Sequence, residues 1–396
     1  MRLSEYISTP LLFFFIFAAS IIAKSVYMPN HNWDMIPYIA AAKSFEEENL
    51  ESLHSFTYDQ LRHSVKEYEY KKMTTGDVGN YRYVISTDSS AFKEQLPFYK
   101  IRPVYTGLIY LLYKAGGNIS FATHIISGVS VFIAVGILYL ISTSFLATPL
   151  IFAVPFLAVI FGIYDLATLS TPDGLGFLAC ILSVYFYLKK YITLLLIILP
   201  IMIGIRTDFI LFTIPLLFFV FLFERSCRWK TLLSILISVG IYIGIITYFK
   251  NPGWSTIFYF ACIQPLIHPI SIPPMLTASD YRWALFRGIK DLYSESFYLY
   301  LLLTTYSIYL INNHANKTSI IIALKAPSTI LTIVCLITVV SHILILPNIE
   351  KRYYSPFYII SAFSFLVMMT RNLTVSDSAQ QYPAPADDSA MPYRRQ

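Results

Sequence analysis

Residues 119–164 read ISFATHIISGVSVFIAVGILYLISTSFLATPLIFAVPFLAVIFGIY, a run of 46 residues without a charged side chain. As one α-helix this run would be about 69 Å long at about 1.5 Å per residue. The hydrocarbon core of a bilayer is only about 30 Å thick. We therefore expect two membrane-spanning helices that turn near residues 147–149. Such a run indicates a polytopic membrane protein rather than a water-soluble domain.

The composition of the whole chain supports this interpretation. Of its 396 residues, 56% are hydrophobic and 13% are charged, about half the charged fraction of soluble domains. The net charge of +6 is spread over the loops and forms no basic stripe, so we expect no nucleic-acid partner. The four cysteines lie far apart and lack metal-type spacing, which predicts no metal or redox role for them.

Charges and prolines divide the apolar sequence into ten predicted spans, so the expected fold class is an all-α polytopic membrane protein with about ten transmembrane helices. The predicted spans are 9–27, 119–143, 148–165, 173–188, 190–206, 208–224, 230–249, 296–313, 327–347 and 354–370. The apolar segment 103–113 lies between the charged loop and Gly116-Gly117, and the alternation of the loops between the two sides works only if it does not span, so it is expected to be an interfacial or re-entrant helix.

Lysine and arginine in the short loops predict a cytoplasmic N-terminus and place both long loops outside. The predicted organisation is a retained anchor at 1–27, a large outer loop with interfacial helices at 28–118, transmembrane helices 2–7 at 119–249, a second outer loop at 250–295, transmembrane helices 8–10 at 296–372 and a disordered cytoplasmic tail at 373–396. We favour an anchor over a cleaved signal because Lys24 follows the apolar run and no clear cleavage site appears.

Residues 28–101 hold 19 of the 52 charged residues, and most of these should face solvent. Charges beside the membrane are better candidates for function, because a desolvated charge is costly. Asp34 follows the first span and has two interpretations. It is either a general base whose pKa is raised by partial burial, or the N-cap of a helix that starts near Met35.

Two more candidates lie where apolar helices meet. Asp173 follows Pro172 and either caps a helix or belongs to a site. Arg206 and Asp208 are two residues apart in a tight hairpin. They either form a local ion pair that closes the turn, or Arg206 points inward at an anion.

Cations also gather on the predicted outer face. Lys100 and Arg102 lie at the exit of the first long loop, and the sequence EKRYY at residues 350–354 precedes the last span. Snorkelling to lipid headgroups explains any one of these cations. Three cationic turns on the side opposite to the positive-inside expectation, with Arg206 in one of them, suggest an anionic ligand such as a lipid phosphate.

Familiar nucleotide and hydrolase motifs are absent from the sequence, which contains no Walker A, HExxH or GxSxG pattern. No predicted span carries the series of buried acids that a proton-coupled transporter needs. The energy for any reaction is therefore expected to come from the substrate itself.

Taken in order, these segments resemble the GT-C superfamily of polytopic glycosyltransferases, which includes the protein O-mannosyltransferases and the aminoarabinose transferases of lipid A. The matching elements are Asp34 after the first span, the large first loop, KIRPVYTGLIYLLYKAGG at 100–117, TPDGLGFLACILSVYFYL at 171–188, IRTDFILF at 205–212 and EKRYYSPFYIISAF at 350–363. One departure is Met35, where the protein O-mannosyltransferases carry the second residue of an acidic pair.

The resemblance implies inverting transfer of a sugar from a polyprenyl-phosphate donor to a glycan or glycolipid acceptor of the cell envelope, as in lipopolysaccharide modification. The expected location is a bacterial inner membrane, with the site on the periplasmic side. Asp34 would be the base that deprotonates the acceptor. The candidates for holding the donor phosphate are Lys100, Arg102, Arg206, Lys351 and Arg352. The candidates for orienting the acceptor or these cations are Asp173, Asp208, Glu350 and Tyr353.

No residue is assigned to a metal, although participation of a divalent cation such as Mg²⁺ or Mn²⁺ stays open. Two other functions also stay open. An O-antigen polymerase would use outer-loop arginines on a pyrophosphate-linked substrate, and Asp34 need not act as a base in it. A transporter of lipid-linked sugars would need polar residues midway through the spans, where this sequence has mostly Ser and Thr.

Overall fold

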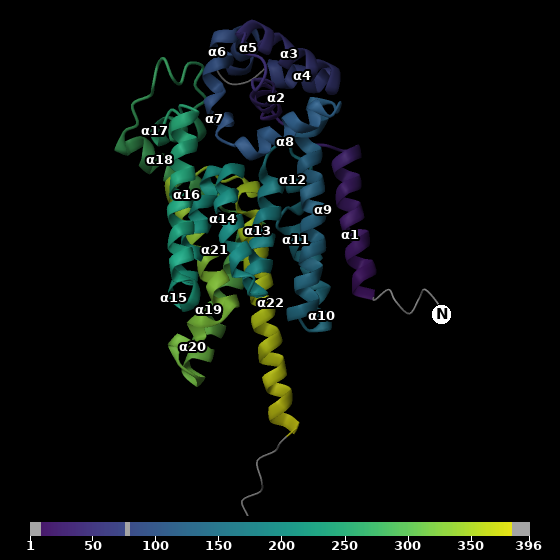
Figure 1. Ribbon diagram of the computed structural model, residues 1–396, viewed down its shortest axis with the longest axis vertical. Helices are drawn as coiled ribbons and strands as arrows, with labels where there is room; N and C mark the ends of the chain where they lie inside the picture. Colours follow the sequence, from purple (N-terminus) through teal and green to yellow (C-terminus); the bar gives the residue numbers. More distant parts are fainter. Residues whose placement is uncertain (1–8, 76–79, 382–396) are drawn as a thin grey trace, which may run out of the picture.

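Helices account for the regular structure of the chain in the computed structural model, which describes residues 9–75 and 80–381 (Figure 1). Within these ranges the β-structure is limited to one bridge between Asn30 and Leu169. The predicted all-α class is therefore confirmed for the described residues. Helices of a membrane protein satisfy their backbone hydrogen bonds internally, which explains why apolar sequence of this length folds as helix.

Long helices form a bundle that fills the lower part of the view in Figure 1. They are α1 (Thr9–Tyr27), α9 (Ile119–Phe145), α13 (Asp173–Leu188), α14 (Ile192–Ile205), α15 (Ile210–Phe223), α16 (Arg228–Tyr248), α19 (Glu295–Lys317), α21 (Pro327–Ile345) and α22 (Lys351–Gln381). Short helices join them: α10 (Thr148–Ile151), α11 (Ala153–Ile160), α12 (Ile163–Thr168), η3 (Thr207–Phe209), η4 (Arg225–Cys227) and α20 (Ile320–Lys325).

Five of the described helical segments are long and apolar enough to cross a membrane: Thr9–Tyr27, Ile119–Phe145, Arg225–Tyr248, Pro327–Ile345 and Lys351–Asn372. Four apolar segments of 10–17 residues accompany them: Thr148–Ile160, Asp173–Leu188, Ile192–Ile205 and Thr207–Phe223. These segments are those of a helical membrane protein. The count of ten spans stays a prediction.

The uncharged run 119–164 turns where the sequence predicted. Helix α9 ends at Phe145 and α10 begins at Thr148. The second half is not one helix, because the chain breaks between α11 and α12 at Gly162, which has a φ of +88°. A Cβ atom at this glycine would lie 2.9 Å from Cε of Lys351 and 3.2 Å from Oδ2 of Asp165. These neighbours are ends of side chains that can shift, so it is the left-handed backbone that favours glycine at this position.

Over the residues that the structure describes, a cap of seven short helices covers one end of the bundle in Figure 1. They are α2 (Met35–Lys43), α3 (Leu50–Ser64), α4 (Glu67–Thr74), α5 (Tyr81–Thr87), α6 (Ser89–Gln95), α7 (Pro97–Lys100) and α8 (Pro103–Lys114). With 12 residues, α8 is about 18 Å long and too short to cross a bilayer. The later segment 250–294 adds α17 (Trp254–Cys262) and α18 (Ala278–Asp291) at the same end.

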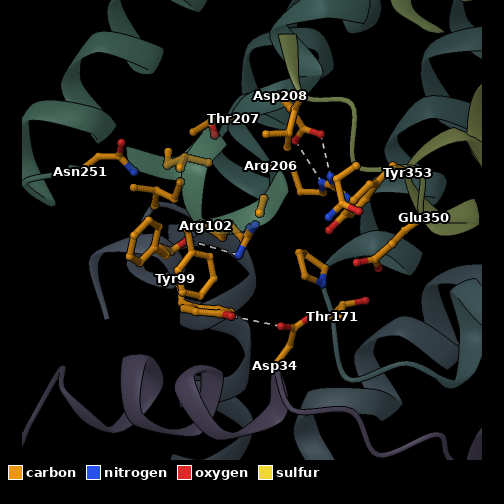
Figure 2. A pocket seen from close by; sticks show the side chains of 18 of the residues that line it. Asp34, Tyr99, Arg102, Thr171, Arg206, Thr207, Asp208, Asn251, Glu350 and Tyr353 are labelled. Atoms are coloured by element: carbon orange, nitrogen blue, oxygen red, sulfur yellow. Dashed lines mark hydrogen bonds and ion pairs between the residues drawn. The ribbon is translucent and has the colours of Figure 1, made fainter. Parts of the chain in front are cut away.

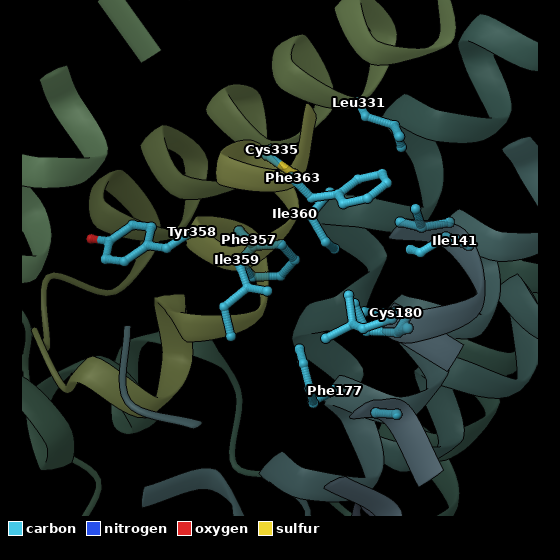
Figure 3. Packing of buried hydrophobic residues seen from close by; sticks show 14 of the residues in the cluster. Ile141, Phe177, Cys180, Leu331, Cys335, Phe357, Tyr358, Ile359, Ile360 and Phe363 are labelled. Carbon is cyan, nitrogen blue, oxygen red and sulfur yellow. The ribbon is translucent and has the colours of Figure 1, made fainter. Parts of the chain in front are cut away.

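The bundle and the cap each have an apolar core of their own. The bundle core is centred on α22. In an 18-residue apolar stretch of this helix 78% of the residues are buried, against 56% or less in the other four candidate spans. Figure 3 shows Phe357, Ile360 and Phe363 of α22 beside Phe177 and Cys180 of α13. The cap core packs α2 against α3, α6 and α8 through a second cluster. Helix α22 also continues to Gln381, into the segment predicted to be disordered, and 382–396 lie outside the described residues.

Candidate functional site

A cavity of about 740 Å³ lies where the cap meets the bundle. Its walls come from segments far apart in the sequence: the start of α2, α7, the start of α13, η3, the ends of α16 and α21, α17 and the start of α22. Figure 2 shows the polar part of this cavity, with Asp34 and Arg102 on one side and Arg206, Asp208, Glu350 and Tyr353 on the other.

The segment that carries Asp34 is fastened to the loop before α13. The amide of Asn30 donates to the Thr168 carbonyl at 3.0 Å, and the amide of Ser170 donates to Oδ1 of Asn32 at 3.2 Å. Nδ2 of Asn32 in turn donates to Oδ2 of Asp34 at 3.0 Å. These contacts bring the end of α1 to the start of α13 and aim Asp34 at the cavity.

Asp34 occupies the N-cap position of α2, but its side chain makes no capping hydrogen bond. Instead, Oδ1 accepts from the Tyr99 hydroxyl at 3.1 Å and Oδ2 accepts from a guanidinium nitrogen of Arg352 at 2.8 Å. The capping interpretation therefore does not describe this carboxylate, which faces the site.

Burial alone would raise the pKa of the Asp34 carboxyl, but the positive charge of Arg352, its hydrogen bond and the charge of Arg102 outweigh that effect. The net result is a lowered pKa, so the expectation of a raised pKa is wrong. Asp34 is therefore an ionised hydrogen-bond acceptor at neutral pH.

Carboxylates and guanidinium groups alternate from Asp34 across the site. Arg352 lies 2.8 Å from Asp34 and 3.6 Å from Asp173. Arg206 also forms an ion pair with Asp173, and two of its nitrogens donate hydrogen bonds to the carboxylate of Asp208 at 3.0 and 2.6 Å. The local pair of Arg206 with Asp208 is therefore present, and Arg206 also reaches a second carboxylate.

The centre of this alternating series is deeply buried, since Asp173 is 2% exposed and Arg206 is 6% exposed. Burying a charge costs several kcal/mol unless a partner of opposite charge compensates it. Thr171 adds a hydroxyl that donates to Asp173 at 2.6 Å. The series ends at His342, whose Nε2 lies 3.5 Å from Asp208 and whose Nδ1 lies 3.2 Å from the Tyr354 hydroxyl.

Arg102 differs from the other two arginines of this series. A terminal nitrogen donates to the Tyr38 hydroxyl at 2.5 Å, and its guanidinium lies 5.5 and 5.6 Å from the rings of Tyr38 and Tyr99. In the described part of the chain, no carboxylate lies within ion-pair distance of it. Arg102 therefore offers charge and hydrogen bonds to a ligand in the cavity.

Part of the cavity wall is apolar. It is formed by Ile210 and Leu211 of α15, Tyr242 and Ile246 of α16, and Ile345 at the end of α21. A ligand with one anionic and one hydrocarbon part would match both parts of the cavity wall.

Eight of the ten predicted site residues line this cavity, namely Asp34, Arg102, Asp173, Arg206, Asp208, Glu350, Arg352 and Tyr353. Lys351 is exposed and lies against Gly162 instead. Lys100 lines a different cavity. Within the described ranges, no three His, Cys, Asp or Glu side chains are grouped so as to hold a metal ion.

Sequence reasoning missed Tyr38, Tyr99 and His342, which hold Arg102, Asp34 and Asp208 in place. In the sequence these residues stand out only as polar side chains inside an apolar segment or beside the KIR sequence at residues 100–102. The chain has 31 tyrosines, so that signal was too common to select these positions.

Comparison of the sequence with protein-family models gives no match. Comparisons with curated proteins and with solved structures give none either. The functional interpretation therefore rests on the geometry of this cavity.

Proposed function

We propose that this chain is a membrane glycosyltransferase of the GT-C type. It would move a sugar from a polyprenyl-phosphate donor to a hydroxyl of a cell-envelope glycan or glycolipid. The observation that carries the proposal is the meeting, in one cavity, of an ionised carboxylate, an arginine without a carboxylate partner and an apolar wall.

The donor fits both parts of the cavity wall. Its phosphate is held by Arg102, because a planar guanidinium presents paired donors to phosphate oxygens. Its prenyl chain lies along the apolar wall that α15, α16 and α21 form. Arg206 and Arg352 are already bound by carboxylates, so they contribute fixed positive charge near the leaving group rather than free donors.

Asp34 acts as the general base in this proposal. The acceptor oxygen forms a bond to the anomeric carbon and gives its proton to the carboxylate. The bond between that carbon and the phosphate oxygen breaks, and its electron pair leaves with the polyprenyl phosphate. Tyr99 and Arg352 each donate a hydrogen bond to Asp34 and orient it.

The proposed topology completes the function. With about ten spans and a cytoplasmic N-terminus, the cap lies on the outer face of a bacterial inner membrane, and lipid-linked donors reach the cavity from the outer leaflet. The cap and α17 then form the entrance for the acceptor.

The test uses purified protein in lipid nanodiscs with a panel of polyprenyl-phosphate sugars, and measures release of free polyprenyl phosphate. We expect release with one donor, and loss of release in Asp34→Asn with donor binding retained. Asp59→Asn is the matched control, because Asp59 is an exposed carboxylate on α3 outside the cavity.

Other outcomes would replace the proposal. Turnover of a pyrophosphate-linked oligosaccharide, with none of any monophosphate donor, would indicate an O-antigen polymerase. Movement of an intact lipid-linked sugar across the bilayer without release of polyprenyl phosphate would indicate a transporter.

A further inference from the structure

A second cavity, of about 700 Å³, shares α7 as a wall with the first. Phe98 and Tyr99 of this short helix line the first cavity, whereas Pro97 and Lys100 line the second. The other walls are the end of α2, the helix α6, the end of α16 and residues 270–271. Lys100 thus belongs to a site of its own, two residues from Arg102.

Positive charge in the second cavity is not balanced. Lys93, Lys100 and Lys250 line it, and no carboxylate of the described chain lies within ion-pair distance of any of them. One acidic residue, Glu94, also lines the cavity, but it accepts hydrogen bonds from residues 270 and 271 and not from these lysines. Its two oxygens accept from the amides of residues 270 and 271 at 2.8 and 2.9 Å, and from the Ser271 hydroxyl at 2.5 Å.

This charge pattern differs from that of the first cavity. There, Arg206 and Arg352 are each held by at least two carboxylates. The second cavity is lined by three lysines and one carboxylate, and none of these lysines forms an ion pair within the described protein. Like charges held in one cavity repel each other unless an anion is bound.

Lys100 is the most enclosed of the three lysines, since Lys93 and Lys250 are exposed. Burial lowers the pKa of the Lys100 ammonium, and no nearby carboxylate offsets that cost. The Ser90 hydroxyl adds a donor in the same cavity, and the described chain offers it no partner. These groups are the usual partners of a phosphate oxygen.

The position and the remaining walls of the cavity favour a lipid. Tyr248 is the last residue of the candidate span Arg225–Tyr248, so the cavity lies at one end of a helix long and apolar enough to cross a membrane. Tyr248 and Phe249 supply aromatic rings of the kind that are enriched at membrane–water interfaces. Phe45, Leu96 and Ile270 add apolar surface for the chain next to a headgroup.

We infer that the second cavity binds the phosphate of an anionic membrane lipid, with Lys93, Lys100 and Lys250 as its ligands. This site is separate from the one that the proposed transferase reaction would use, and its occupancy does not depend on turnover. A bound headgroup would link the cap to the end of α16, because its ligands come from α6, from α7 and from the second residue after α16.

The test is a binding titration on the full chain in detergent, after its lipid has been removed. The probes are short-chain phosphatidylglycerol, phosphatidylcholine of equal chain length and inorganic phosphate. Wild-type protein should bind phosphatidylglycerol about tenfold more tightly than phosphatidylcholine, because only the former has a net negative charge. The combined variant Lys93→Gln, Lys100→Gln and Lys250→Gln should lose that preference.

Two controls keep the result specific. The double variant Lys71→Gln and Lys72→Gln removes two exposed charges from α4, outside the cavity, and should bind like the wild type. Asp59→Asn removes an exposed carboxylate of α3 that lies outside both cavities, and it should also bind like the wild type. Circular dichroism and gel filtration establish that each variant is folded, and the single variant Lys100→Gln serves if the combined one is not.

An unchanged preference for phosphatidylglycerol in the folded lysine variants would overturn the inference. Equal binding of both lipids by the wild type would overturn it as well. Competition by inorganic phosphate at millimolar concentration, with no preference between lipids, would retain an anion site but refute its assignment to a lipid. Failure of the transferase assay would leave all these outcomes unaffected.

Discussion

Breaking the buried pair of Asp173 and Arg206 should cost far more free energy of unfolding than breaking an exposed pair. The side chains of Asp173 and Arg206 are 2% and 8% exposed. Removing one partner of such a pair typically costs about 3–5 kcal/mol, because the other charge is left buried. Asp208 still compensates Arg206 in Asp173→Asn, so we expect a loss near the lower end, about 3 kcal/mol.

A double-mutant cycle measures the interaction itself. The variants are Asp173→Asn, Arg206→Gln and the two combined, unfolded in mixed micelles of increasing dodecyl sulfate content and followed by circular dichroism. We expect a coupling free energy of about 2 kcal/mol, since the double variant removes both charges. The exposed pair of Lys190 and Glu224, at 2.5 Å with side chains 55% and 27% exposed, is the matched control and should give about 0.5 kcal/mol.

A coupling free energy between Asp173 and Arg206 no larger than that of the control pair would refute this prediction. Such a result would mean that the site is open to water, so that its charges are screened. It would also remove the basis for treating Arg206 as fixed positive charge in the proposed reaction.

Three further predictions concern the first cavity and its support. Arg102→Gln should weaken binding of a polyprenyl-phosphate donor at least about tenfold in a direct titration, because it removes charged hydrogen bonds worth about 1.5–3 kcal/mol; an unchanged affinity would exclude Arg102 as the phosphate ligand. The pKa of Asp34 is depressed, so this carboxyl stays ionised at pH values below its usual pKa of 3.8. Activity should therefore be lost only as the pH falls through that lowered pKa. Arg352→Gln removes the main cause of the depression and should shift the acid limb of the pH–rate profile to higher pH. Gly174→Ala places a Cβ atom 2.7 Å from a backbone oxygen of α9 and should destabilise the fold by about 1–3 kcal/mol in the same unfolding assay, whereas Gly240→Ala, with open space around it, should be neutral or slightly stabilising.

Much of the helical framework could be predicted because its signals are local. The spans predicted at 9–27 and 173–188 coincide with α1 and α13, and the turn at 147–149 lies between α9 and α10. Runs of apolar residues and the charges and prolines that interrupt them are properties of neighbouring residues. The break at Gly162 was missed because a single glycine in an apolar run does not by itself reveal a left-handed backbone, which Gly162 adopts with a φ of +88°.

The sequence by itself determined the all-helical class, the approximate bounds of the long bundle helices and the kinds of charge beside the apolar segments. Only the tertiary structure decided which charges meet. Arg352 reaches Asp34 across 318 residues and Arg206 reaches Asp173 across 33, and no local pattern specifies such pairs. Lys100 and Arg102 are near neighbours in the chain, yet Lys100 at the end of α7 lines one cavity and Arg102 before α8 lines the other. The apolar pattern that specifies each helix is a property of residues close together in the chain, whereas the site forms only when the cap packs onto the bundle.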